Sequence, residues 1–119
     1  MSYILVIDDE QHICWLVAEA LSPFGYLVQT STNWREGLSL VKEKPPALIL
    51  LDLKLPGVSG TALLGEIKRL VPEVPVVLMT GEVEVVENTA VAGCLTKPFN
   101  LEDLRRLVQR IMPFLPARP

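Results

Sequence analysis

The feature that most constrains this chain is a regular alternation between short apolar runs and longer segments with helical spacing. Residues 4–7, 47–51 and 74–79 are almost entirely apolar, and residues 26–30 and 93–96 are weaker strand candidates. Runs this short and apolar on both faces are typical of strands in a parallel sheet that is covered on both sides. Five strands are therefore predicted, with helices between them.

The intervening segments each place apolar residues on one helical face. Gly25 is predicted to stop the first helix, Asn33 and Glu36 resemble a capping box that opens the second, and Asn100 is expected to cap the last. The predicted buried faces are Ile13, Leu16, Val17, Ala20, Leu21 and Phe24; then Trp34, Leu38 and Val41; then Leu63, Leu64, Ile67 and Leu70; and finally Leu101, Leu104, Leu107, Val108 and Ile111.

The resulting order is (βα)₅, an α/β fold with a doubly wound five-stranded parallel sheet, because right-handed crossovers place helices on both faces. Ligands of such sheets bind outside the carboxyl ends of the strands, near the topological switch point. One domain is expected over residues 1–112, followed by a proline-rich tail at residues 113–119.

Composition excludes several classes of protein. Half of the residues are hydrophobic, so a core can form without disulfides or structural metal. No apolar run approaches the roughly 20 residues that span a bilayer, and no signal peptide follows Met1. Cys14 and Cys94 match no metal or redox motif and are interpreted as reduced core thiols of a cytoplasmic protein. The net charge of −3, without a basic stripe, argues against direct nucleic-acid binding.

Polar residues follow the predicted strands where each strand ends. A parallel sheet brings these ends to one edge, so carboxylates, a hydroxyl and an ammonium are expected to converge there. In chain order they are Asp8-Asp9 with Glu10, Asp52, Thr80-Gly81 and Lys97-Pro98.

This set of side chains suits phosphoryl transfer. Crowded carboxylates repel one another, and a hard divalent cation such as Mg²⁺ relieves that repulsion through oxygen ligands. Asp52 could then attack phosphorus and form an acyl phosphate, while Lys97 and the metal neutralise the phosphoryl group and Thr80 donates a hydrogen bond to it.

At this point the chain resembles, over about residues 3–112, the receiver domains of bacterial response regulators, and is similar to the single-domain chemotaxis regulators. The resemblance lies in Asp8-Asp9, in the stretch from Leu51 through Asp52 to Gly60, in Thr80-Gly81, and in Leu95-Thr96-Lys97-Pro98-Phe99. It implies a flavodoxin-like strand order of 2-1-3-4-5. It also implies a phosphorylation switch in two-component signalling, a phosphoprotein that is not an enzyme in the ordinary sense.

The resemblance also assigns roles to individual residues. Asp52 would receive the phosphoryl group from a histidine kinase or a histidine phosphotransfer protein. Asp9 and Asp52 would ligate Mg²⁺ through their carboxylates, Asp8 through a water molecule and Lys54 through its backbone carbonyl.

For the remaining site residues, the resemblance implies that Lys97 pairs first with the acceptor and later with the phosphoryl oxygens. The Lys97–Pro98 peptide bond would be cis. Thr80 would move toward the phosphoryl group on activation, and Pro56 with Gly57 would shape the loop after the acceptor.

Two features depart from the family pattern. Cys94 stands where receivers carry an aromatic residue that moves with Thr80, so a different switch mechanism is expected, or else Cys94 only fills a small gap in the core. Thr80 and Lys97 lie 17 positions apart, which is short for the family. The fourth helix, within residues 82–92, is therefore predicted to be shortened, and the surface that it forms with the last strand and helix to be remodelled.

Several surface residues have alternative interpretations. Lys54 and Glu82 flank the phosphoryl site in the family; they either form an ion pair that slows hydrolysis or are two solvated charges. His12 is expected to be exposed near the acidic pocket. Trp15 lies outside the predicted buried face of its helix. It is either simply exposed or the anchor for a docked kinase or phosphotransfer domain.

The sequence also leads to expectations about the protein's partners. We expect a monomer or weak dimer that acts on a downstream protein or on an output domain outside this chain.

The alternative is a receiver-like interaction module that works without phosphorylation. A flavodoxin is disfavoured because the acidic run at residues 8–10 would repel a cofactor phosphate. A haloacid-type phosphatase is disfavoured because Lys54 replaces the second acid that it needs, and no Walker loop is present.

Overall fold

The fold was analysed in a computed structural model that describes residues 2–81 and 91–113. Its centre is a five-stranded parallel sheet with the strand order β2-β1-β3-β4-β5. The strands are β1 (Ile4–Ile7), β2 (Val28–Ser31), β3 (Leu48–Asp52), β4 (Val76–Thr80) and β5 (Gly93–Thr96). The helices are α1 (Gln11–Leu21), α2 (Trp34–Glu43), α3 (Gly60–Leu70) and α4 (Leu101–Ile111), with a short 3₁₀ turn η1 (Ser22–Phe24) after α1. The predicted fold class and strand order are confirmed.

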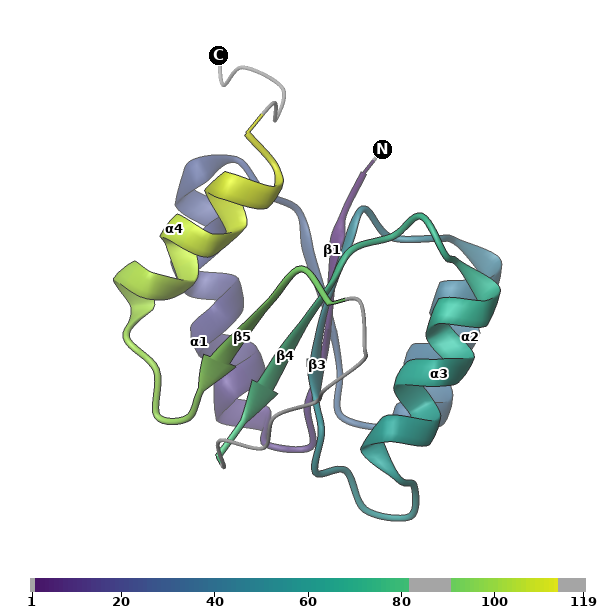
Figure 1. The fold of residues 1–119 in the computed structure, drawn as a ribbon. Coiled ribbons are helices and arrows are strands. Elements are labelled where there is room, and N and C mark those ends of the chain that lie inside the picture. Colours follow the sequence, from purple (N-terminus) through teal and green to yellow (C-terminus); the bar gives the residue numbers. More distant parts are fainter. Residues whose placement is uncertain (1, 82–90, 114–119) are drawn as a thin grey trace.

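The helices form two layers, one on each face of the sheet. Helices α1 and α4 cover one face, and α2 and α3 cover the other (Figure 1). Alternate residues of each strand face opposite layers. Within β1, Ile4 and Val6 pack into the α1/α4 core while Leu5 and Ile7 pack into the α2/α3 core. Both faces of the central strands are thus buried, which explains why β1, β3 and β4 are continuous apolar runs.

Side-chain caps begin three of the helices. The Asn33 side chain accepts hydrogen bonds from the backbone N–H groups of Arg35 and Glu36, at 2.8 and 3.4 Å. Asn100 accepts one from Glu102 at 2.7 Å, and Ser59 accepts one from Ala62 at 3.4 Å. The caps predicted at Asn33 and Asn100 are confirmed. These bonds satisfy backbone donors that have no partner within the helix.

The structure corrects some predicted boundaries. The first helix ends at Leu21, and Phe24 is 38% exposed in η1 instead of continuing the buried face. Gly25 then adopts a φ of 90°, so the chain does turn at the predicted glycine. The second strand begins at Val28 and not at Tyr26, and β4 begins at Val76, after Pro75. Tyr26 and Val74 are buried outside the strands, whereas Leu27 is exposed. The backbone oxygens of Leu27 and Pro75, directly before these strands, still accept hydrogen bonds from Ile4 of β1 and Ile49 of β3.

Most of two predicted segments lies outside the described residues. These are the shortened fourth helix, predicted within residues 82–92, of which 82–90 are not described, and the tail predicted at residues 113–119, of which 114–119 are not described. The described residues contain four α-helices, which fits a (βα)₅ chain whose fourth helix is short. Across residues 2–81 and 91–113, none of the helices has the length and apolar character to cross a bilayer.

Candidate functional site

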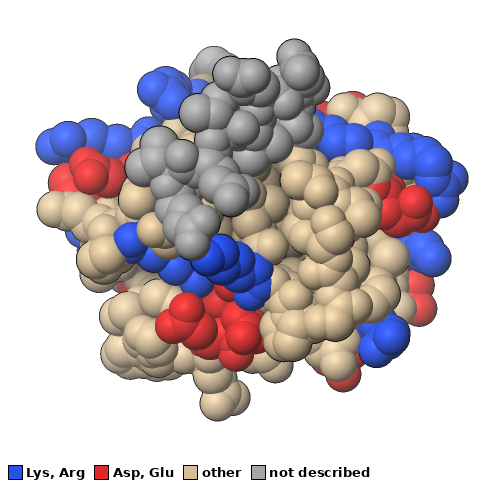
Figure 2. Space-filling model, turned by 60° about the horizontal axis from the view of Figure 1, so that its bottom comes forward, with Lys and Arg blue, Asp and Glu red and all other residues tan. Residues whose placement is uncertain are grey.

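The carboxyl ends of β1 and β3 bring three carboxylates together. Asp8, Asp9 and Asp52 each offer an oxygen, and these oxygens all lie within 4.8 Å of one another. On this face of the molecule, acidic side chains gather in one patch directly beside basic ones (Figure 2). The parallel pairing of β1 with β3 creates this cluster, because Ile7 stands opposite Leu51 and the next residue of each strand is an aspartate.

Two of the three carboxylates are buried. Asp8 is fully buried and Asp52 is 4% exposed, whereas Asp9 is exposed. Each buried carboxylate accepts a backbone hydrogen bond from the second residue after it: Glu10 N–H donates to Oδ1 of Asp8 at 2.9 Å, and Lys54 N–H donates to Oδ1 of Asp52 at 3.0 Å. The chain turns that follow β1 and β3 therefore orient both carboxylates.

Lys97 reaches into this cluster from the end of β5. Its Nζ lies 2.7 Å from Oδ2 of Asp8, 3.3 Å from Oε1 of Glu10 and 3.4 Å from Oδ2 of Asp52. The Lys97 N–H donates to the backbone oxygen of Thr80 at 2.6 Å, which ties β5 to β4 at this point. The Lys97–Pro98 peptide bond is cis. One ammonium is thus shared among three carboxylates that come from two different strand ends.

The electrostatics of the cluster follow from burial and charge. Burial raises the pKa of Asp52 to about 6, and the negative charge of Asp8 adds to this, while the Lys54 N–H and the Lys97 ammonium act in the opposite direction. Burial disfavours the charged form of Lys97, but the surrounding carboxylates, led by Asp8, outweigh it and raise the pKa of Lys97. Lys97 is therefore charged at neutral pH, and the Asp52 carboxyl holds its proton more tightly than an ordinary aspartate.

The donor set fits a hard divalent cation. Oδ2 of Asp8 is buried and has no hydrogen-bond partner among the described residues, although the Lys97 ammonium lies 2.7 Å from it as an ion pair. The carboxylates of Asp8, Glu10 and Asp52 share this ammonium, and a cation beside them would offset the remaining negative charge. Carboxylate oxygens are the ligands that Mg²⁺ and Ca²⁺ use. The residues present are therefore suited to such a metal.

Thr80 and Lys54 flank the cluster. Thr80 is buried at the end of β4, where it stands opposite Thr96 of β5. Lys54 is exposed in the loop after β3. Both line a small hollow of about 190 Å³, together with Leu53, Ser59, Gly60 and Thr61. Glu82, the predicted partner of Lys54, lies outside the described residues, so the proposed ion pair stays a prediction.

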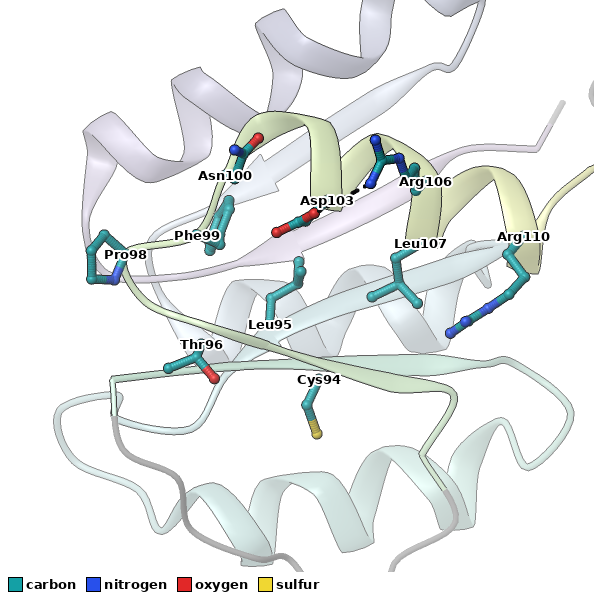
Figure 3. A pocket seen from close by; sticks show the side chains of 10 residues that line it. All are labelled: Cys94, Leu95, Thr96, Pro98, Phe99, Asn100, Asp103, Arg106, Leu107 and Arg110. Atoms are coloured by element: carbon teal, nitrogen blue, oxygen red, sulfur yellow. Dashed lines mark ion pairs between the residues drawn. The ribbon is translucent and has the colours of Figure 1, made fainter.

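Cys94 is exposed, which contradicts its prediction as a core thiol and as the filler of a small core gap. Its strand neighbour Leu95 faces the α1/α4 core, and Cys94 therefore points the other way (Figure 3). A surface hollow of about 600 Å³ lies over β5 and along α4; it is lined by Cys94, Leu95, Thr96, Pro98, Phe99, Asn100, Asp103, Arg106, Leu107 and Arg110. Cys14, in contrast, is buried as predicted.

Helix α1 presents the two surface residues that the sequence singled out. Trp15 is 61% exposed, as predicted, beside a hollow of about 440 Å³. His12 is exposed, as predicted, and its Nδ1 lies 3.9 Å from Oε2 of Glu10. The role of Trp15 in docking stays a prediction.

Glu10 is the site residue that sequence reasoning missed. Its position directly after Asp8-Asp9 was noted, but no role was assigned to it. The structure places its carboxylate within reach of Lys97, at 3.3 Å. A run of three acids at one strand end was the available signal, because a third carboxylate there competes for the cation that the first two attract.

Comparisons with known proteins agree on one family. The model for the response regulator receiver domain matches residues 4–109. The chain is 32% identical over 115 residues to sporulation initiation phosphotransferase F of Bacillus subtilis, covering 92% of this chain and 93% of that protein. It is also 34% identical over 110 residues to the DNA-binding transcriptional regulator NtrC of Salmonella typhimurium, covering 88% of this chain but only 24% of that longer protein.

Solved structures of similar chains have the same fold. The receiver domain of NtrX from Brucella abortus superposes with a TM-score of 0.85 at 33% identity, covering 94% of this chain and 99% of that one. The response regulator protein TrrA from Thermotoga maritima, solved in complex with Mg(2+)-BeF, superposes with a TM-score of 0.83 at 31% identity, covering 93% and 99%.

Proposed function

The chain belongs to the response regulator receiver domain family, and we propose that it is a Mg²⁺-dependent phosphorylation switch whose acceptor is Asp52. The observation that carries the proposal is the position of this carboxylate. It stands at the carboxyl edge of the sheet, within 4.8 Å of two other aspartates and 3.4 Å from the Lys97 ammonium. This is the arrangement that a nucleophilic carboxylate and a doubly charged phosphoryl group both require.

In the proposed reaction, an Asp52 carboxylate oxygen attacks the phosphorus of a phosphohistidine on a kinase or phosphotransfer protein. An acyl phosphate bond forms, the bond from phosphorus to the donor nitrogen breaks, and the donor imidazole takes up a proton. Lys97 is positioned to bind a phosphoryl oxygen, because it already lies between Asp8 and Asp52. Thr80, buried at the adjacent strand end, offers a hydroxyl to the same group.

Asp8, Asp9 and Asp52 would hold the metal, with the backbone carbonyl of Lys54 as a further ligand. When bound, Mg²⁺ supplies positive charge that offsets the carboxylates and the phosphoryl oxygens. The excess of carboxylates over the Lys97 ammonium in this cluster supports this assignment. The Mg(2+)-BeF complex of TrrA supports it further, since that protein is 31% identical to this chain.

The chain would act as a phosphoacceptor that assists its own phosphorylation and dephosphorylation, and not as an enzyme with a separate substrate. Its effect would pass to a downstream protein or to an output domain outside this chain; NtrC, a DNA-binding transcriptional regulator, is matched over only 24% of its length. The proposed switch would act in the cytoplasm, where phosphohistidine donors of two-component systems act.

The test is Mg²⁺-dependent phosphorylation by acetyl phosphate, read by intact-protein mass. We expect the mass of one phosphoryl group to be added to the wild type, and none to Asp52→Asn or to the wild type in EDTA. Asp103→Asn is the matched control, because Asp103 is an exposed aspartate on α4 outside the cluster. An unmodified wild type that also binds no Mg²⁺ would favour the alternative, an interaction module that works without phosphate, for which the exposed Cys94 in place of an aromatic is the supporting observation.

A further inference from the structure

The turn that follows the acceptor strand lies against a tryptophan from another element. Gly57 adopts a φ of 82°, and a Cβ built on it would lie 3.7 Å from Nε1 of Trp34. A side chain at position 57 would thus reach the Trp34 ring, which places the turn beside the indole. The indole edge of Trp34, the first residue of α2, therefore faces the tip of the loop that runs from Leu53 to Ser59.

The same loop is tied at its base to the acceptor. The Lys54 N–H donates to Oδ1 of Asp52 at 3.0 Å. At the far end of the loop, Gly60 packs so closely on Leu53 that an added Cβ would lie 2.2 Å from the Leu53 carbonyl oxygen. Leu55, midway along, is only 6% exposed. The loop is thus fixed at the acceptor, in the middle and where it closes, and its positive-φ turn lies beside Trp34.

Trp34 is itself held in place. The Asn33 side chain caps the helix that Trp34 begins, and Ser31 Oγ donates to the Asn33 backbone oxygen at 2.7 Å. The Arg35 guanidinium lies 4.7 Å from the centre of the Trp34 ring. The ring is half-buried and packs on the α2/α3 core cluster that contains Leu55. These contacts fix the position of the large Trp34 ring, so that it can restrict the motion of the loop beside it.

We propose that Trp34 is a positioning residue for the acceptor loop, which it borders at Gly57 and meets through the core cluster that contains Leu55, and that its indole responds when the Asp52 site is filled. A cation or phosphoryl group at Asp52 changes the acceptor of the Lys54 N–H bond, and the pinned loop passes that change to the turn at Gly57. The inference rests on the proposed function, because it presumes that Mg²⁺ and a phosphoryl group bind at Asp52.

The first test uses the fluorescence of Trp34 alone. The chain has two tryptophans, so Trp15→Phe leaves Trp34 as the single indole. We expect Mg²⁺ to change the emission of this variant with a saturation curve that matches the Kd from calorimetry, and beryllofluoride to change it again. Adding Asp52→Asn should abolish the beryllofluoride step. An emission that stays flat while calorimetry shows Mg²⁺ binding would overturn the inference and leave the proposed function standing.

The second test measures Mg²⁺ affinity by calorimetry in folded variants, with folding checked by circular dichroism. We expect Trp34→Ala to weaken Mg²⁺ binding about tenfold, the lower end of the effect of groups that orient metal ligands. Trp34→Phe, which keeps an aromatic wall, should recover most of the affinity. Trp15→Ala is the matched control and should bind as the wild type. A Trp34→Ala variant that loses stability but binds Mg²⁺ with unchanged affinity would mean that Trp34 only fills space.

The two failures are distinguishable. A wild type that binds no Mg²⁺ and takes up no phosphoryl group contradicts the proposed function, and with it this inference. A wild type that does both, with a silent Trp34, contradicts the inference alone.

Discussion

The Nζ atom of Lys97 lies 2.7 Å from Oδ2 of Asp8, closer than to either of its other two carboxylate partners. Asp8 is fully buried, and the Lys97 side chain is 14% exposed. A buried carboxylate and a nearly buried ammonium thus offset each other's desolvation in the state without metal or phosphate. In the proposed switch, Lys97 would be shared with a new anion at Asp52, so this pair bears on stability and on the proposed function.

Removing the ammonium should therefore destabilise the fold. We expect Lys97→Met to lower the free energy of unfolding by about 3 kcal/mol in EDTA at pH 7.5, since breaking one side of a buried ion pair leaves the other charge unpaired. Urea denaturation measures this. Arg106→Met is the control, because Arg106 pairs only with exposed acids of α4 in the described structure, and its loss should change stability by under about 0.5 kcal/mol. Equal effects of the two substitutions would contradict a stabilising role for the Lys97 contacts.

Asp52 makes stability depend on pH in the metal-free protein. Burial raises the pKa of the Asp52 carboxyl in the folded protein to about 6, above the ordinary value of 3.8. At a pH between these two values, the folded protein keeps a proton on Asp52 that the unfolded chain has already lost. Its contribution to stability therefore falls as pH rises from about 4 to about 7.

Asp52→Asn removes this penalty. At pH 7.5 in EDTA we expect the variant to be more stable than the wild type by about 2–3 kcal/mol, the equivalent of the pKa shift, with little difference near pH 4. Adding Mg²⁺ at pH 7.5 should stabilise the wild type more than the variant. Denaturation curves at both pH values measure the difference in the free energy of unfolding. A variant that is less stable than the wild type at pH 7.5 would show that the charged Asp52 carboxylate does not destabilise the fold.

The two thiols should differ sharply in reactivity. Cys14 is 3% exposed and donates its S–H to the Asp8 backbone oxygen at 3.4 Å, and burial, together with the charge of Asp8, raises its pKa to about 11. Cys94 is exposed. Brief treatment with iodoacetamide at pH 7.5 should add one label, on Cys94, because only an accessible thiolate reacts. In urea both cysteines should be labelled. Two labels on the folded protein would contradict the burial of Cys14.

Glu10 should restrain Lys97. The Glu10 carboxylate lies 3.3 Å from Lys97 Nζ and competes with any phosphoryl group for it. We expect Glu10→Gln to tighten beryllofluoride binding in Mg²⁺ about two- to fourfold, a small effect because Glu10 is exposed and solvent screens its charge. Calorimetry measures it, and the effect should shrink at high salt. Glu102→Gln, on an exposed turn of α4, is the control, and a weaker affinity in Glu10→Gln would mean that Glu10 helps hold the metal.

Most of the architecture could be predicted because it depends on local pattern. A run such as Leu48 to Leu51, which is apolar on both faces, is stable in a sheet that is covered on both sides. The side-chain oxygens of Asn33 and Asn100 begin helices by accepting hydrogen bonds from backbone N–H groups of the first turn. The meeting of Asp8 with Asp52 also follows, because parallel strands align their carboxyl ends.

The errors came from positions where a distant segment decides the outcome. Phe24 continues a helical apolar pattern, yet the helix stops at Leu21, and Phe24 lies at the surface against the Arg105 guanidinium, 5.2 Å from the ring centre. Cys94 sits in an apolar stretch, but it lies on an edge strand, where alternation separates its side chain from the core that Leu95 enters.

By itself, then, the sequence determined the alternation of strands and helices and the identity of the residues at the acidic edge, since these depend on periodicity, capping and the geometry of parallel strands. The strand order followed from the resemblance to a known family. Only the tertiary structure decided which carboxylates share Lys97, how far burial raises the pKa of Asp52, and that Trp34 lies beside the turn at Gly57. Those properties arise from distances between side chains on separate elements, and the free energy of a charge or a contact depends on those distances and on the solvent that packing excludes.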